Sequence, residues 1–354
     1  MKKTLTAVLI GLMGIAAAVI PATSHASKNT KKVAAAKAAS APAFSESQDV
    51  HEFIQTMHEQ HGFDVEHLTR QFSRIHSNQT VLRAIRPAAV PELQRSWQRY
   101  RARFLNERRL TAGLRFWEEN GAELKRAEAI YGVPQEIIVA IIGVETEYGR
   151  NMGSFSVLEA LSTLAFDYPP RAPFFRNELE QFLLMARENG FSPLDYKGSY
   201  AGAIGIPQFM PSSQRRFAVD FDGDDRVDLR RSPTDAIGSV ARFLNMHGWQ
   251  ANAPVAVPAS VSQDPAALIA AGIKPTQPLQ ALQEQGIVAL TSAPVANDKP
   301  AALIDLASPD EPTEYWLGFD NFYVITRYNR SSFYAMSVFL LAETLREARV
   351  TTAG

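Results

Sequence analysis

A single carboxylate stands at the end of the most apolar stretch of the sequence. Residues 137–144 carry no polar side chain, and Glu145 follows them directly. A helix that is apolar on every side is a buried helix, so Glu145 is expected among aliphatic neighbours, which disfavour ionisation and raise the pKa. Such a carboxyl can act as a general acid near neutral pH. The alternative is that Glu145 is an ordinary exposed carboxylate at a helix end. Glu147, two residues further on, is expected to point away from Glu145.

A second group of acids has the spacing of metal ligands. The candidate ligands are Asp220, Asp222, Asp224, the carbonyl of Arg226 and, in a longer loop, Asp235. The alternating acids match the first half of a calcium-binding loop. Two positions depart from that pattern, because position six is Asp225 instead of Gly and position twelve is Arg231, whose side chain cannot bind a cation. The residues fit an acidic turn without a metal equally well.

A loop rich in Gly and Pro, residues 197–213, is expected to be structured and to lead into a short helix. Polar groups on such a loop, near a buried acid, are suited to orient a ligand. A plain surface connector is the alternative, but the many small residues indicate close approach of backbone segments. Earlier in the chain, residues 168–171 (Tyr-Pro-Pro-Arg) form a rigid connector that carries a guanidinium.

The elements that must position these groups are mostly helices. Pro134 suits the first helical position and Gly149 a C-terminal stop for the helix that carries Glu145. Apolar periodicity predicts further helices at 122–131, 158–166, 174–187, 236–247 and 331–346, the last with Tyr334, Val338, Leu341 and Leu345 on one stripe. From 253 to 320, short apolar runs separated by turns predict a small strand-rich subdomain.

One stretch, residues 93–119, interleaves seven arginines with aromatic residues. The arginines are Arg95, Arg99, Arg101, Arg103, Arg108, Arg109 and Arg115. The pattern fits a basic, aromatic face that binds a polymer, and it fits an amphipathic helix with a charged outer side. The formal net charge of the chain is -1, which gives no overall electrostatic case for nucleic acid.

The N-terminus has the pattern of a signal peptide. Lys2 and Lys3 precede an apolar segment at 5–20, and Ser-His-Ala at 24–26 is a cleavage site. A basic, polar leader follows, without apolar periodicity. The chain has no cysteine, which argues against a lipid-anchored cysteine and against disulfides. Five histidines between 51 and 76 lack the spacing of a zinc site and are expected to be surface or packing residues.

Several motifs follow one another along the chain. They are Gly143-Val-Glu145-Thr-x-Tyr-Gly-Arg150, Gly198-Ser199-x-Ala-Gly-Ala-x-Gly205, Gln208-Phe-Met-Pro-Ser-Ser213, the Asp220 loop, Asp235-Ala-Ile-Gly-Ser239 and Thr326-Arg-Tyr-Asn329. In this order they resemble the lytic transglycosylase B family of peptidoglycan-cleaving enzymes, from about residue 49 to residue 350. The resemblance implies a mainly α-helical (α+β) fold with a lysozyme-like helical core, an N-terminal α-helical domain and a small β-rich subdomain.

Together the patterns and the resemblance predict a domain organisation. The ranges are a signal peptide at 1–26, a flexible basic linker at 27–48, a mainly α-helical domain at 49–132, a lysozyme-like catalytic core at 133–252 with an EF-hand-like loop at 220–235, a β-rich subdomain at 253–320 and a C-terminal return to the core at 321–350.

The resemblance also implies roles for single residues. Glu145 falls on the family's single catalytic acid. The residues that fall on sugar-subsite positions are Ser199, Gln208, Tyr328, Asn329 and Tyr334, and Arg171 falls on an arginine near the peptide or lactyl groups. Two positions depart from some relatives, because Pro170 replaces a second arginine and Phe243 replaces an aromatic hydroxyl.

The implied reaction cleaves the bond between N-acetylmuramic acid and N-acetylglucosamine without water and leaves a 1,6-anhydro sugar. A calcium ion would have a structural role, with no cofactor required for the chemistry. The expected partner is the peptidoglycan glycan strand, with no nucleic acid and no membrane anchor, for a soluble periplasmic monomer. Two alternatives remain: a hydrolytic muramidase on the same scaffold and a non-catalytic wall-binding protein.

Overall fold

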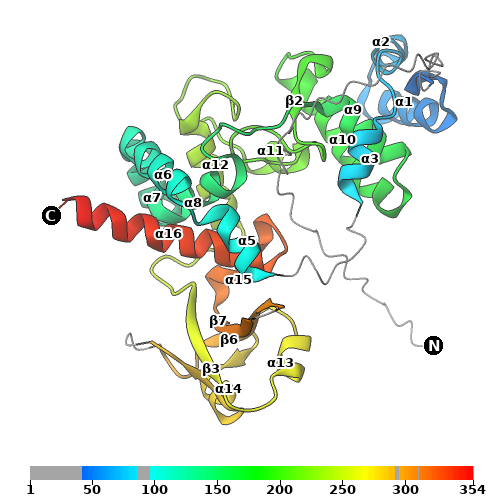
Figure 1. Cartoon of the computed structure of the whole chain (residues 1–354). Helices are drawn as coiled ribbons and strands as arrows, with labels where there is room; N and C mark the ends of the chain where they lie inside the picture. Colours follow the sequence, from blue (N-terminus) through cyan, green and yellow to red (C-terminus); the bar gives the residue numbers. More distant parts are fainter. Residues whose placement is uncertain (1–41, 87–95, 292–294, 310, 354) are drawn as a thin grey trace, which may run out of the picture.

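The structure, a computed structural model, describes residues 42–86, 96–291, 295–309 and 311–353. Helices dominate it, as Figure 1 shows. The α-helices are α1 (Gln48–His61), α2 (Val65–Phe72), α3 (Gln79–Ile85), α5 (Trp97–Phe104), α6 (Glu107–Glu119), α7 (Gly121–Tyr131), α8 (Gln135–Thr146), α9 (Val157–Phe166), α10 (Ala172–Glu188), α11 (Pro211–Phe217), α12 (Pro233–Met246), α13 (Ala266–Ala270), α14 (Leu279–Glu284), α15 (Asp320–Tyr328) and α16 (Ser332–Ala353). Short 3-10 helices lie at η1 (Phe44–Glu46), η2 (Pro169–Arg171) and η3 (Pro193–Asp195).

The apolar stretch forms α8, and its residues from 137 to 144 are all buried. The predicted ends of this helix were wrong by a few residues. Pro134 is the N-cap, with a ψ of 144°, so the helix begins at the next residue. At the other end, Glu147 and Tyr148 have φ values of 51° and 61°, so the chain leaves the helix before Gly149. Glu145 therefore lies in the last turn, as predicted.

Two hydrophobic cores hold the helices together, and each joins segments far apart in the sequence. The first core gathers side chains of α5 to α8, α12, α15 and α16. The second gathers η1, α1, α2 and α3 with α9, α10 and the start of the glycine-rich loop. The last helix matches its predicted stripe, because Tyr334, Val338, Leu341 and Leu345 are all buried. The predicted boundary between residues 132 and 133 remains a prediction.

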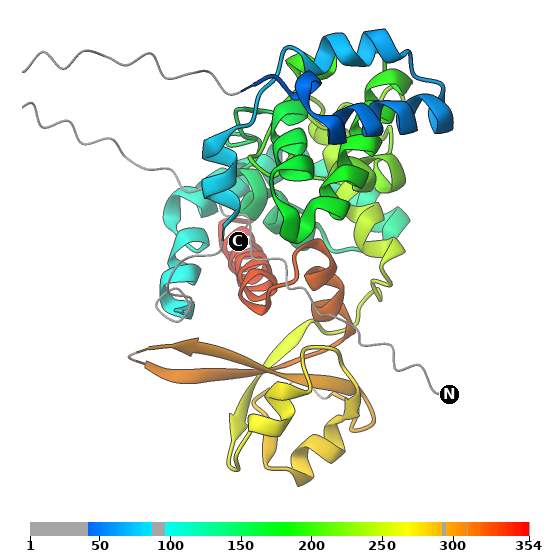
Figure 2. The same ribbon diagram turned by 90° about the vertical axis from the view of Figure 1, so that its right-hand side faces the viewer.

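The strand-rich subdomain is present as predicted. Its strands are β3 (Ala256–Val261), β4 (Gln277–Pro278), β5 (Ile287–Ala289), β6 (Pro300–Ser308) and β7 (Glu311–Gly318). They form one antiparallel sheet in the order β4-β6-β7-β3-β5, with Leu303 opposite Leu317 in the central pair. The sheet has its own core and lies to one side of the helices, next to α15 and α16 (Figures 1 and 2). The sequence pattern missed β4 and the short helices α13 and α14.

The arginine-rich stretch forms two helices and not one. α5 and α6 are separated at residues 105–106, where the side chain of Asn106 accepts a hydrogen bond from the backbone of Arg109 and caps α6. Its aromatic residues Trp97, Phe104, Phe116 and Trp117 are buried in the first core. Most of its described arginines are exposed. The aromatic half of the pattern is therefore core packing, and the basic half is surface.

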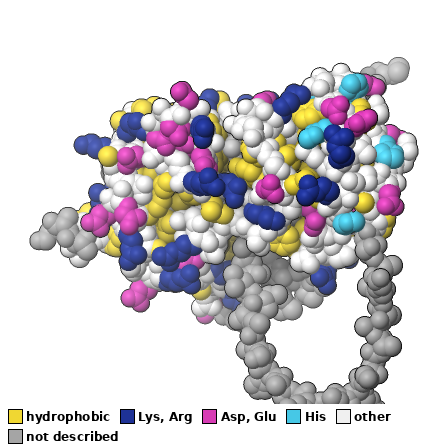
Figure 3. Space-filling model, turned by 90° about the horizontal axis from the view of Figure 1, so that it is seen from above, with side chains coloured by type: hydrophobic (Ala, Val, Ile, Leu, Met, Phe, Trp, Pro, Cys, Tyr) yellow, Lys and Arg dark blue, Asp and Glu magenta, His cyan; other side chains and the backbone are white. Residues whose placement is uncertain are grey.

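The remaining predictions concern the N-terminal segment, membrane helices and the histidines. The predicted signal peptide at 1–26 and most of the linker at 27–48 lie outside the described residues, as do residues 87–95. Among the residues that are described, no single helix has the length and apolar character needed to cross a membrane. α7 and α8 reach that length and apolar character only together, as a pair bent by 114°. Figure 3 shows histidine side chains gathered mainly at the end of the molecule that the N-terminal helices form. The group of potential metal ligands found within the described part consists of aspartates.

Candidate active site

Glu145 is a half-buried carboxyl with one hydrogen-bond donor at hand. The hydroxyl of Tyr334, from α16, donates to Oε1 of Glu145 over 2.6 Å. Burial raises the pKa of Glu145 from 4.5 to about 7, and the Tyr334 hydrogen bond opposes that rise only in part. The direction matches the sequence prediction. A carboxyl with this pKa is populated in both its acid and its base form near neutral pH, which is what a proton-transfer catalyst needs.

Two further tyrosines lie near the acid. Tyr328, at the end of α15, stacks on Tyr334 with 6.4 Å between ring centroids. Tyr100, on α5, was missed by the sequence analysis. Its pKa is raised by burial and by the negative charge of Glu145, which places the phenol within electrostatic reach of that carboxylate. Only the packing of α5 against α16 brings Tyr100 here, so no local motif could have indicated it.

The glycine-rich loop packs against the end of α8. The hydroxyl of Thr146 donates to the carbonyl of Ile206 over 2.8 Å, and the hydroxyl of Tyr328 donates to the carbonyl of Pro207 over 2.6 Å. Gln208 follows in a left-handed conformation, with a φ of 52°. Its amide nitrogen donates to the carbonyls of Gly205 and Met152, at 2.8 and 3.2 Å. The loop is structured, as predicted, and it is fixed beside Glu145.

Ser199 organises the start of the same loop. Its Oγ accepts hydrogen bonds from the backbone of Ala201 and Ala203, at 3.3 and 3.0 Å. The side chain is largely buried, so its first role here is to shape the turn. The hydroxyl proton stays available for an acceptor on a ligand.

Asn329 and Arg171 are the remaining predicted substrate-binding residues. Asn329 follows α15, and its Oδ1 is buried without a hydrogen-bond partner among the described residues. Arg171 stacks on Phe174 and Phe175, with its guanidinium carbon 4.4 and 5.2 Å from the ring centroids. Burial lowers the pKa of Arg171, and the nearby charge of Arg330 lowers it further. The connector therefore lies within electrostatic reach of the residue next to Asn329.

Glu147 has a different environment, as predicted. Its carboxylate lies 2.6 Å from Nε of Arg108 and accepts a hydrogen bond from Asn151 over 3.0 Å. These contacts hold Glu147 toward α6. Within the described part of the chain, Glu145 has no hydrogen bond or ion pair with a second carboxylate.

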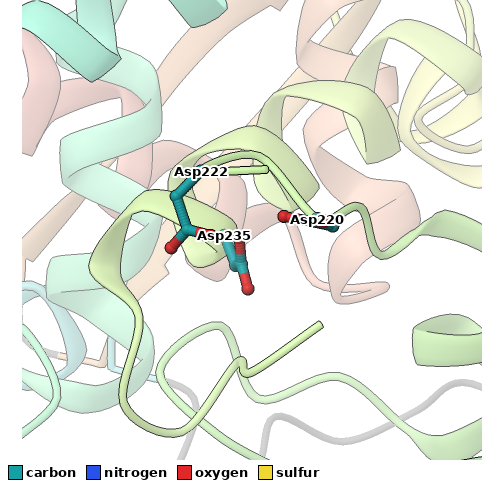
Figure 4. Close-up of side chains that lie close together, drawn as sticks. All are labelled: Asp220, Asp222 and Asp235. Atoms are coloured by element: carbon teal, nitrogen blue, oxygen red, sulfur yellow. The ribbon is translucent and has the colours of Figure 1, made fainter. Parts of the chain in front are cut away.

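The acidic loop between α11 and α12 gathers three carboxylates. Asp220, Asp222 and Asp235 each offer an oxygen, and these oxygens lie within 4.8 Å of one another (Figure 4). Asp220 accepts from three backbone amides of the loop, and Asp235 accepts from those of Phe221 and Asp228, both at 2.8 Å. Three converging carboxylates are the donor set that a calcium ion prefers, so these residues fit that ion.

The structure accounts for the two positions that depart from the calcium-loop pattern. Asp225, at the position of the usual Gly, has a φ of 66° and takes the left-handed conformation that this position requires. Asp235 lies in the cluster, where the twelfth residue of a standard loop would supply its carboxylate. Asp224 is not in the cluster, and its carboxylate accepts a hydrogen bond from the backbone of Arg226 over 3.0 Å. Alternating spacing alone cannot tell which acids turn inward.

Comparisons with known proteins identify the family of this chain. Residues 45–343 match a family model described as a transglycosylase SLT domain. The chain is 42% identical over 318 residues to the membrane-bound lytic murein transglycosylase B of Escherichia coli (strain K12), covering 87% of this chain and 85% of the relative.

Solved structures match over most of their length. The soluble lytic transglycosylase SltB1 from Pseudomonas aeruginosa gives a TM-score of 0.78 at 47% identity, covering 85% of this chain and 99% of that chain. The Escherichia coli lytic transglycosylase Slt35 in complex with calcium gives 0.77 at 40% identity, covering 88% and 96%. SltB3 from Pseudomonas aeruginosa in complex with NAG-NAM-pentapeptide gives 0.73 at 29% identity, covering 84% and 79%.

Proposed function

The chain belongs to the lytic transglycosylase family with the SLT domain, and from that premise we propose that Glu145 is the single acid and base of its reaction. The chain is a peptidoglycan lytic transglycosylase, a lyase that acts on murein. The observation that carries the assignment to Glu145 is its half-buried carboxyl, with a pKa raised to about 7 and Oε1 held by Tyr334 at 2.6 Å.

In the first step, Glu145 is protonated. Because Oε1 accepts from Tyr334, Oε2 carries the proton toward the glycosidic oxygen between N-acetylmuramic acid and N-acetylglucosamine. The bond from C1 to that oxygen breaks, and the N-acetylglucosamine unit leaves with the proton. The carbonyl of the substrate's own N-acetyl group stabilises the positive charge at C1. Tyr334 stabilises the carboxylate that Glu145 becomes.

In the second step, the same carboxylate acts as the base. Glu145 removes the proton of the muramyl 6-hydroxyl, and that oxygen forms a bond to C1. The attack is intramolecular and gains from a high effective molarity. Glycosidases that use water place a second carboxylate on the other side of the bond, and Glu147 is held away by Arg108. The product is a 1,6-anhydro sugar, and no water is consumed.

The substrate-binding roles follow from position and hydrogen-bonding capacity. Ser199 keeps a hydroxyl proton to donate, and Asn329 keeps a buried, unpartnered amide oxygen to accept. Gln208, Tyr328 and Tyr334 lie on the elements that surround the acid. Arg171 supplies a guanidinium suited to a carboxylate. These polar groups would position the N-acetyl group and hydroxyls of the strand.

Mass spectrometry of purified sacculi digested in heavy-oxygen water tests the reaction. We expect muropeptides that end in 1,6-anhydro-N-acetylmuramic acid, each lighter by one water than the product of a lysozyme and without label. Labelled, reducing muramic acid as the main product would instead establish hydrolysis, the activity of a muramidase. No turnover at all by the folded wild-type protein would favour a wall-binding role.

A calcium ion at Asp220, Asp222 and Asp235 would support the structure and take no part in the chemistry. The ion would neutralise part of the negative charge of the three carboxylates and cross-link the loop to the start of α12. The convergence of the oxygens within 4.8 Å supports this site, as does the complex of Slt35 with calcium.

Export to the periplasm is the remaining part of the proposal. The basic residues, apolar segment and cleavage site of the first 26 residues support a signal peptide, with a soluble, monomeric mature protein that begins near Ser27. N-terminal sequencing of the protein from a periplasmic extract tests this. A membrane fraction that retains Lys2 and Lys3 would show that the leader is an anchor.

A further inference from the structure

A surface hollow on the outer side of α6 has no part in the chemistry proposed above. It has a volume of about 420 Å³ and is lined by Glu107, Arg108, Thr111, Ala112, Arg115 and Arg150. Five of these residues lie on α6, and Arg150 comes from the turn after α8. We call it the arginine pocket.

The arginine pocket is positively charged on a chain whose formal net charge is -1. Three of its side chains are guanidiniums, and Glu107 is the one acid in the described lining. Arg115 is exposed and forms no ion pair among the described residues. With Glu147, which pairs with Arg108 and Arg150, the pocket sets three guanidiniums against two carboxylates. Arg115 is therefore the guanidinium that supplies the net positive charge an anion would meet.

Two of the pocket's guanidiniums, those of Arg108 and Arg150, are oriented by one buried carboxylate. Glu147 is buried, and its carboxylate lies 2.6 Å from Nε of Arg108 and 3.9 Å from Nη1 of Arg150. One buried acid thus orients two guanidiniums, which reduces the side-chain entropy that ligand binding would cost. Glu147 is itself held by a hydrogen bond from Asn151, so the two guanidiniums pair with a fixed carboxylate.

The pocket lies close to the reacting centre along the chain. Glu147 is two residues after Glu145, so their Cα atoms are at most about 7 Å apart. On the other side, α6 follows α5, which carries Tyr100 near the carboxylate of Glu145. Glu147 faces Arg108 while Glu145 faces Tyr334, so a bound group must extend around this turn to meet the arginines. An extended peptide spans about 3.5 Å per residue, so a stem of a few residues on a strand at Glu145 is long enough to do so.

We propose that the arginine pocket binds a carboxylate of the peptide stems that peptidoglycan carries. The proposal rests on the function proposed above. A guanidinium presents a planar fork that matches a carboxylate, and the peptide stems are the carboxylate-bearing part of the murein strand. The pocket thereby makes the enzyme prefer peptide-substituted strands to bare glycan.

The test compares soluble glycan strands that carry peptides with strands stripped by an amidase. Arg115→Gln and Arg150→Gln should each raise KM for the peptide-bearing strands by about two- to fivefold, the size expected of one exposed ion pair. The double variant should raise it roughly tenfold. For stripped strands, KM and kcat should stay at wild-type values. Arg83→Gln, on the exposed side of α3, is the matched control and should change nothing.

Two results would overturn the proposal. One is an unchanged KM of the double variant on peptide-bearing strands. The other is an equal rise on both substrates, which would mean that the arginines bind the glycan or shape the cleft. Arg115→Lys separates charge from fork geometry and should recover part of the loss, and melting curves verify folding. Wild-type turnover of stripped strands reports on the proposed function separately, so the two failures are distinguishable.

Discussion

The molecule holds two acidic centres that treat carboxylates in opposite ways. Around Glu145, aliphatic and aromatic side chains isolate one carboxyl and raise its pKa to about 7, with a single tyrosine hydroxyl as donor. In the loop between α11 and α12, three carboxylates lie within 4.8 Å of one another and accept hydrogen bonds from backbone amides. The first centre is suited to move a proton, and the second is suited to hold a cation.

The difference shows that the surroundings of an acid determine its function. A desolvated carboxyl with one neutral donor is stable in its protonated form. In the acidic loop, burial raises the pKa of Asp235, and the hydrogen bonds from the backbone of Asp228 and Phe221 oppose that rise. Three carboxylates close together repel one another, and a bound divalent ion relieves that repulsion. Each of the following predictions tests one side of this contrast.

The largest effect is expected from Glu145→Gln. The amide has nearly the same shape but carries no transferable proton, so both steps lose their acid and base. We expect turnover of sacculi to fall by at least about 10²–10⁴-fold, the usual contribution of general acid–base catalysis, with an unchanged melting temperature near pH 5. Muropeptide release by mass spectrometry is the measurement.

Glu147→Gln is the matched control in the same turn. It removes a carboxylate that pairs with Arg108 and not with substrate, so most of the turnover should remain at temperatures where the protein is folded. Near-normal activity of Glu145→Gln, or a loss of the same size in Glu147→Gln, would break the distinction between the two acids.

The acidic loop should respond in stability and not in chemistry. Asp235→Ala leaves the backbone amides of Phe221 and Asp228 without their acceptor. An orphaned buried donor costs about 1–3 kcal/mol, and the amide of Asp228 is only partly buried. We therefore expect the free energy of unfolding to fall by about 1–4 kcal/mol, measured by denaturant titration without calcium. Asp224→Ala, outside the cluster, should lose much less. Equal losses in the two variants would show that the carboxylate cluster contributes no more to stability than an acid outside it.

Tyr334→Phe sharpens the account of the buried acid. The tyrosine hydroxyl stabilises the ionised form of Glu145 and so lowers its pKa. Without that donor, the pKa should rise by about 1–2 units, as a hydrogen bond to a charged group is worth about 1.5–3 kcal/mol. The first step requires the protonated acid, so wild-type activity should fall as the pH rises through about 7.

In the Tyr334→Phe variant, the loss of activity on the alkaline side of the pH–rate profile (the alkaline limb) should move to higher pH. The maximal rate should drop, because the carboxylate formed in the first step is less stabilised. The pH–rate profile of kcat is the measurement. A limb that stays in place or moves to lower pH would mean that Tyr334 does not act on the charge of Glu145.

Much of this fold could be predicted from the sequence because it follows from local patterns. An apolar run of eight residues is long enough to define a buried helix, and the period of the last helix fixed its inward stripe. Short apolar runs separated by turns gave the strands of the β subdomain. The position of Glu145 at a helix end followed from the same reasoning.

The rest depends on contacts between distant segments. α8 ends early because Glu147 pairs with Arg108 of α6 and Tyr148 packs closely against Gly113 and Gly143. Tyr100 approaches the acid through the packing of α5, which no spacing reveals. In the acidic loop, spacing marked Asp224 as a ligand, but the fold brings together the carboxylates of Asp220, Asp222 and Asp235 instead. Tertiary contacts decide these details, so a single sequence does not contain them in readable form.

The smallest effect, and the last test of the contrast, is the response to calcium. Sites of the extracellular type bind with a Kd on the order of 10⁻⁴–10⁻³ M, so 10 mM calcium should stabilise the native state by about 1.4–2.7 kcal/mol. The melting temperature should then rise by a few degrees over that in chelator, with turnover unchanged. Asp222→Asn is the most informative variant, because Asp222 is exposed and, among the residues that the structure describes, its side chain bonds to Ser232 alone. The loop should keep its backbone hydrogen bonds but lose one charge facing the ion, so the response to calcium should shrink while the melting temperature in chelator stays the same or rises.

A wild-type melting temperature that is equal in chelator and in 10 mM calcium would mean that the loop is an acidic turn without a calcium site. Full retention of the response in Asp222→Asn would place the ion elsewhere.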